Sequence, residues 1–146
     1  MFRRRILTVG CILLMLIITL CGCKTQPEFS TDTKPIYNHF PNLPKTDKIS
    51  WYNETLEGIG PTTVKLYVFA QYETSEQLNE FLQNIDIATE TSTIEAKYLP
   101  DAIDSNNIWY ELQNVPFCFQ EEGPNTMNTK VYVNDTHTVL FMYAIG

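Results

Sequence analysis

The stretch from Thr62 to Tyr72 reads TTVKLYVFAQY and determines the fold class, because its side chains alternate along the chain. One side carries the aliphatic residues Val64, Leu66, Val68 and Ala70. The other side carries Lys65, Tyr67, Phe69 and Gln71. A period of two residues predicts a β-strand, here with an aliphatic core face and an aromatic second face.

An amphipathic helix is expected directly after this strand, over residues 74–85. Thr74 and Gln77 have the spacing of a capping box, and Glu76 lies in the first turn, where the helix dipole favours a negative charge. One apolar stripe follows at the spacing i, i+3, i+4 and i+7, formed by Leu78, Phe81, Leu82 and Ile85. Such a stripe must be buried against another element.

The rest of the chain predicts further strands. Residues 108–112, 115–120, 130–133 and 136–143 are the segments concerned, and Asn134-Asp135 suits a two-residue hairpin between the last two. Residues 86–107 leave both a strand and a helical turn open, ended by Pro100. We therefore expect residues 49–146 to form one α+β domain with two layers, in which one amphipathic helix packs on a mostly antiparallel sheet.

The N-terminus predicts an export signal. Arg3, Arg4 and Arg5 precede an uncharged apolar run from Ile6 to Leu20. A basic region followed by an apolar region of roughly 7–15 residues is typical of a secretory signal. A membrane-spanning helix needs about 20 apolar residues, so this run is short for a permanent anchor.

The end of this run, Leu20-Cys21-Gly22-Cys23, resembles the lipobox of bacterial lipoproteins. The resemblance implies that residues 1–22 are a signal peptide, that a signal peptidase cuts between Gly22 and Cys23, and that Cys23 carries a diacylglyceryl group. Cys21 is the competing candidate, but it would place the bulky Leu20 at the small-residue position. The mature protein is then expected on the extracytoplasmic face of the cell membrane, where two acyl chains give stable anchoring.

Residues 23–48 are expected to form the lipidated N-terminus and a tether. Four prolines break this segment and favour extended backbone, Pro27, Pro35, Pro41 and Pro44. If the tether is fully extended, it reaches about 80 Å. Its apolar residues leave two alternatives open: they dock on the edge of the domain, which we favour, or they form a short recognition segment. These residues are Ile36, Tyr37, Phe40 and Leu43.

The charge balance of the mature chain excludes some partners. From Cys23 onward there are seven lysines and no arginine against all 17 acidic residues, a formal charge of −10. Nucleic-acid binding needs clustered Lys and Arg, so we expect no nucleic-acid partner. Electrostatic attraction to an anionic membrane is equally unfavourable, so the lipid on Cys23 must provide the attachment.

The chain also shows no catalytic, cofactor or metal motif. His39 and His137 have no second ligand at a metal spacing. Cys118 lies between two phenylalanines, where burial raises the pKa of a thiol and makes it unreactive. There is no glycine-rich phosphate loop and no Gly-x-Ser-x-Gly. We therefore expect a protein that is not an enzyme and has no cofactor.

Aromatic residues on the predicted strands are the candidate partner-binding surface, namely Tyr67, Phe69, Tyr110 and Tyr132. They either bind a flat ligand, a sugar or a protein, or pack beneath the helix or the tether. The first hypothesis is a non-enzymatic binding or accessory domain that meets an envelope or secreted protein. The alternatives are an immunity or inhibitor-type protein that neutralises a specific toxin or enzyme, since an acidic face steers a basic partner, and, with less support, a small envelope hydrolase.

Overall fold

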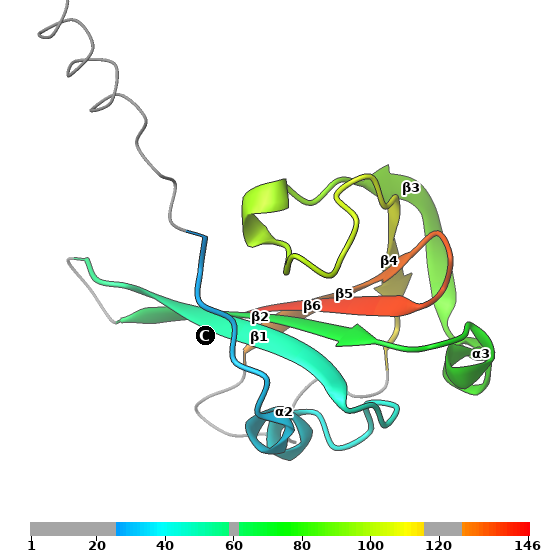
Figure 1. The fold of residues 1–146 in the computed structure, drawn as a ribbon, viewed down its shortest axis with the longest axis horizontal. Helices are drawn as coiled ribbons and strands as arrows, with labels where there is room; N and C mark the ends of the chain where they lie inside the picture. The colour runs from blue at the N-terminus through cyan, green and yellow to red at the C-terminus, as the bar shows by residue number, and fades with distance from the viewer. Residues whose placement is uncertain (1–25, 59–61, 116–126) are drawn as a thin grey trace, which may run out of the picture.

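The described residues form an antiparallel sheet of six strands with two short helices. It is seen in a computed structural model that describes residues 26–58, 62–115 and 127–146. The strand order is β1-β2-β6-β5-β4-β3 (Figure 1). The strands are β1 Lys48–Leu56, β2 Thr63–Gln71, β3 Asp86–Ser92, β4 Trp109–Gln113, β5 Asn128–Asn134 and β6 Val139–Ile145. The helices are α2 Thr33–His39 and α3 Glu76–Leu82, with one 3₁₀ turn, η1 Ala96–Tyr98. The predicted α+β class with an antiparallel sheet is confirmed at this level.

Strand β2 is the predicted strand, and its alternation separates two apolar clusters on the two faces of the sheet. Leu66, Val68 and Ala70 belong to the first cluster, whereas Tyr67 and Phe69 belong to the second. All five side chains are less than 9 % exposed. The sheet is therefore buried on both faces over this strand, whereas the sequence predicted one core layer.

The first cluster lies on the face that α2 and α3 share. It combines aliphatic residues of the four central strands with Ile36, Phe40, Leu78 and Leu82 from the helical segments. The structure does not confirm one amphipathic helix packed on the sheet, because α3 has only seven residues and lies past the end of β2 (Figure 1). Two short helical segments contribute to the cluster instead.

The capping box that predicted α3 is half formed. The Gln77 Oε1 accepts hydrogen bonds from the backbone N–H groups of Glu73 at 2.7 Å and Thr74 at 3.3 Å. The Thr74 hydroxyl bonds the Glu76 carboxylate instead of a backbone N–H and lowers the pKa of that carboxylate. The helix consequently begins at Glu76, with Ser75 at its N-cap and no side-chain bond there.

The second cluster lies on the opposite face, beneath the segment that follows β3. Leu99 and Ile103 from this segment pack with Phe69, Trp109 and Phe141 from the sheet. Figure 1 shows η1 and its loop above the sheet, on the side away from α2. Residues 86–107, which the sequence left open, thus form the edge strand β3 and then a cover over the aromatic face.

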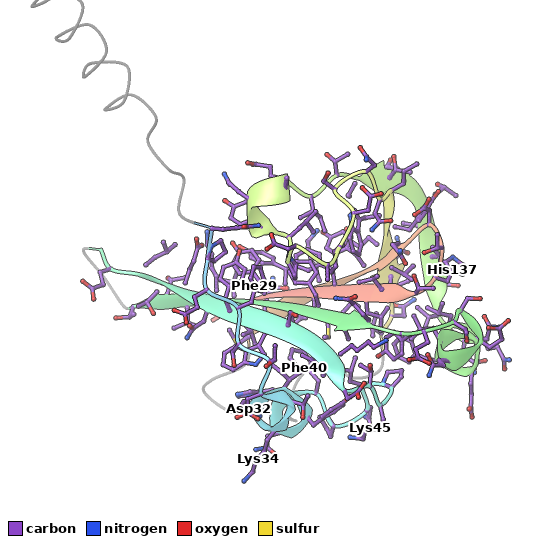
Figure 2. The ribbon with its side chains drawn as sticks, viewed as in Figure 1. Phe29, Asp32, Lys34, Phe40, Lys45 and His137 are labelled. Atoms are coloured by element: carbon purple, nitrogen blue, oxygen red, sulfur yellow. The ribbon has the colours of Figure 1, made fainter. Side chains whose placement is uncertain are left out.

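The described part of the predicted tether is docked on the domain, so it is not an extended spacer. Residues 33–39 form α2, where Ile36 is 1 % exposed, and Phe40 at its end is 0 % exposed. Figure 2 shows Phe40 below β1 and Phe29 above it. Of the two alternatives that the sequence left open, the structure shows docking, because the apolar residues that interrupt the polar segment are buried against the sheet.

The turn between β5 and β6 also differs from the prediction. Instead of a two-residue hairpin at Asn134-Asp135, four residues separate Asn134 from Val139. The cause is the buried Asn134 side chain, whose Oδ1 accepts from the N–H groups of Thr138 and Val139, both at 2.9 Å. His137 takes a positive φ of 54° within this turn. The strand expected at 115–120 extends outside the described residues.

Candidate functional site

A cleft opens on the aromatic face of the sheet, where the cover formed by residues 92–103 ends. Its volume is about 440 Å³. Strands β2, β5 and β6 form its floor, and the segment from Ser92 to Tyr98 forms one wall. The lining residues are Lys65, Tyr67, Ser92, Thr93, Ile94, Glu95, Tyr98, Tyr132, Phe141 and Tyr143. We call this feature the aromatic cleft.

Strand register places the tyrosines of the floor side by side. Tyr67 on β2 is opposite Tyr52 on β1 and opposite Tyr143 on β6. The rings of Tyr52 and Tyr67 stack at 4.5 Å between centroids with an interplanar angle of 4°. The Tyr143 ring lies 5.0 Å from the Tyr67 ring at 53°. One row of cross-strand neighbours thus joins Tyr67 and Tyr143 of the cleft floor to Tyr52 on the neighbouring strand β1.

The wall of the cleft carries a third ring of this stack. Tyr98 of η1 stacks on Tyr67 at 5.5 Å with an interplanar angle of 9°. The neighbouring Lys97 holds its ammonium 4.5 Å from the centre of the Tyr98 ring and 2.7 Å from the Glu95 carboxylate. Tyr98 is only half-buried, so its ring both stacks on Tyr67 and lines the cleft.

Two tyrosine hydroxyls of the cleft, those of Tyr67 and Tyr132, have pKa values raised above the usual range and stay protonated at neutral pH. Burial, and next the Glu54 carboxylate, raise the pKa of Tyr67, whose hydroxyl donates a hydrogen bond to Glu54 at 3.3 Å. Burial also raises the pKa of Tyr132, aided by Glu111. Among the described lining residues, the charged side chains are Lys65 and Glu95. The cleft therefore offers ring faces and neutral hydroxyls.

The described residues that line the cleft are mainly aromatic and hydroxyl-bearing side chains. No histidine or cysteine is among them. The described ranges contain no cluster of three or more His, Cys, Asp and Glu side chains that could hold a metal. Buried polar atoms without a partner in these ranges include the Tyr52 hydroxyl and the Trp109 Nε1, neither of which belongs to a residue lining the cleft.

Two carboxylates, Glu90 and Glu111, line a second hollow of about 380 Å³ between β3 and β4. The hollow lies where the β3–β4 register shifts between Ile87 and Thr91. Glu111 is paired there with Lys130 at 3.2 Å.

The structure separates the four aromatic residues that the sequence singled out. Tyr67 and Tyr132 line the aromatic cleft. Phe69 is 0 % exposed beneath the cover and presents no surface to a partner. Tyr110 packs against the cluster on the opposite face. The sequence missed Tyr98 because it lies in the segment for which no periodicity was found.

The remaining candidate residues lie elsewhere. Gly22, Cys23 and Cys118 lie outside the described residues. His39 is the last residue of α2, and Figure 2 shows His137 at the far end of the sheet from Phe29. Within the described ranges, helices are too short and too polar to cross a bilayer.

Comparison with known proteins does not add a family to these observations. No family model, no curated protein and no solved structure matches the chain.

Proposed function

We propose that this chain is a non-enzymatic binding domain, anchored by lipid on Cys23 to the extracytoplasmic face of the cell membrane, and that the aromatic cleft binds a glycan of the envelope. The observation that carries the proposal is the tyrosine-lined cleft beside the stack of Tyr52, Tyr67 and Tyr98. The lipobox resemblance of residues 20–23 supports the location.

The size of the cleft favours a small or narrow ligand over a folded protein. A stable protein interface occupies about 800 Å² per partner and about 20–30 residues on each side. The aromatic cleft has ten described lining residues and a volume of about 440 Å³, which is within the range of small-ligand sites. A few sugar units of one glycan strand fit this description.

The chemistry of the cleft favours an uncharged sugar. A pyranose ring presents C–H groups on its flat face, which pack on aromatic rings, and hydroxyl groups at its edge. The cleft offers the half-buried rings of Tyr98 and Tyr143 for the face. The hydroxyls of Ser92 and Thr93 lie at the wall for the edge. A highly charged polyanion is disfavoured, because Lys65 is the single cation among the described lining residues and the mature chain is acidic.

A direct binding measurement tests the cleft. The probe is the β-1,4-linked trimer of N-acetylglucosamine, titrated by calorimetry into the soluble chain that begins at Lys24. Tyr98→Ala should weaken binding about tenfold, because losing one ring contact costs about 1.4 kcal/mol. The matched control is Tyr110→Ala on the opposite face, which should leave the affinity unchanged. Equal effects of the two changes, or no binding by the unmodified chain, would contradict the proposed site.

The anchor is tested separately. Cys23→Ser should release the protein from the membrane fraction or leave an uncleaved precursor, because no diacylglyceryl group can be attached. Fractionation and the intact mass of the protein measure both outcomes. A Cys23→Ser protein of mature size that stays in the membrane fraction would refute the lipid anchor.

A further inference from the structure

Residues 26–32 form a strap that holds the N-terminal end of the described chain against the cover of the aromatic face. The side-chain amide of Gln26 donates to the carbonyl oxygen of Leu99 at 3.1 Å. Leu99 directly follows Tyr98, which lines the aromatic cleft. The start of the strap is therefore fixed beside the wall of the cleft, on the same side of the sheet as η1 (Figure 1).

Further contacts secure the strap along its length. The Phe29 ring packs edge-on against Tyr52, 5.0 Å between centroids at 81°. Ser30 and Trp51 exchange two backbone hydrogen bonds at 2.7 and 2.9 Å, and the Trp51 indole N–H donates to the Asp32 carbonyl at 2.8 Å. The strap thus adds a short bridge to β1 and an aromatic contact to the second cluster.

The strap leaves little chain between the domain and the lipid. Gln26 is three residues after Cys23, and three residues span at most about 10 Å. If the strap were released as far as Asp32, nine residues would span about 30 Å. The docked strap therefore shortens the reach of the anchor about threefold and places its attachment point beside the cleft.

We propose that the strap holds the aromatic cleft at the bilayer surface, so that the glycan it binds is itself attached to lipid in the same membrane. This inference depends on the lipid anchor and on the glycan site proposed above. The charge of the mature chain is consistent with it, because an acidic domain has no electrostatic attraction of its own to an anionic surface. The strap is what keeps the cleft close.

Energy transfer from the domain to the bilayer tests the position of the cleft. The full mature protein, its lipidation verified by mass, is reconstituted in phosphatidylcholine vesicles that contain an acceptor-labelled lipid. A donor dye is attached at Glu95→Cys on the wall of the cleft or, as the matched control, at Lys34→Cys on α2, with Cys118→Ser in both. Both labelled positions are exposed, and Figure 2 shows Lys34 pointing away from the sheet on the opposite side.

Transfer should be more efficient from position 95 than from position 34. A Gly-Ser insertion of about 20 residues between Thr25 and Gln26 should lower both efficiencies and remove the difference, because the domain then tumbles freely on a flexible linker. Phe29→Ala should give an intermediate result by loosening the strap. Equal transfer from the two positions in the unmodified chain, or no effect of the insertion, would overturn the inference.

The source of the glycan is tested in the same vesicles. Lipid that carries the N-acetylglucosamine trimer as its head group should occupy the cleft at a lower total amount than the free trimer, because protein and glycolipid share one surface. Occupancy is followed by intrinsic tyrosine fluorescence. Equal potency of the two forms would overturn the lipid-attached source and favour a wall polymer. The energy-transfer result does not depend on glycan binding, so a failure of this inference can be distinguished from a failure of the proposed glycan site.

Discussion

Replacement of Asn134 by alanine should destabilise the domain by about 2–3 kcal/mol. Asn134 is 2 % exposed and its side chain organises the turn between β5 and β6. The Oδ1 accepts from the backbone N–H groups of Thr138 and Val139 at 2.9 Å each, and the Nδ2 donates to the Thr136 hydroxyl at 2.7 Å. Leaving a buried donor without an acceptor costs about 1–3 kcal/mol, and the bond at Val139 is buried. The Thr138 N–H, which loses the same acceptor, and the smaller side chain add to this cost.

Urea unfolding of the soluble chain that begins at Lys24, followed by tryptophan fluorescence, measures the effect. The matched control is Asp135→Ala, because Asp135 is the exposed neighbour in the same turn and its own backbone N–H bond to Ile108 survives the change. The control should lie within about 0.5 kcal/mol of the unmodified chain. If Asn134→Ala also lies within that range, then the turn does not depend on these hydrogen bonds and the reasoning is refuted.

Two further predictions concern alkaline pH and the docking of α2. Burial is the main cause that raises the pKa values of Tyr52, Tyr67 and Tyr72 far above their usual range. Above about pH 10 the unfolded chain loses tyrosine protons that the folded chain keeps, so the free energy of unfolding should fall as the pH rises further. The urea concentration at the unfolding midpoint, measured between pH 8 and pH 11, tests this. A midpoint that stays constant over this range would contradict the prediction. Phe40→Ala should lower the free energy of unfolding by about 3–5 kcal/mol, because this ring is fully buried against the sheet. The control for Phe40→Ala is Lys34→Ala on the exposed side of α2. If both variants lose equally little stability, α2 is not docked in solution.

The central strands were predictable because both of their faces carry apolar side chains in a regular alternation. β2 and β6 lie in the middle of the sheet, and their residues alternate between an aliphatic and an aromatic cluster. β1 is an edge strand whose burial follows no simple alternation, since Ile49 and Tyr52 are buried and Asn53 is exposed. An edge strand has one neighbour instead of two, so fewer of its positions need apolar side chains. For this reason the sequence did not predict β1.

Half of the aromatic cleft was predictable and half was not. Tyr67 and Tyr132 follow from strand alternation, because a residue's face in a sheet depends on its position along the strand. The wall depends on Tyr98, which lies in a single 3₁₀ turn. Such a turn has no periodic pattern to reveal it, and its position over Tyr67 results from the ring stack and from the Leu99 contact with the strap. Long-range contacts of this kind leave no local signal.

The cleft follows from a mismatch between the aromatic face of the sheet and the segment that covers it. Phe69 and Trp109 lie under the cover and are 0 % exposed, whereas Tyr132 and Tyr143 on the same face are half-buried. Extending the cover over these rings would have buried more apolar area, at about 25 cal/mol per Å². The uncovered tyrosines carry hydroxyls that can bond water, so their exposure costs less than that of phenylalanine. Tyr132 and Tyr143 can therefore stay in contact with water at little cost, and this exposure supports the binding site that we propose at their end of the face.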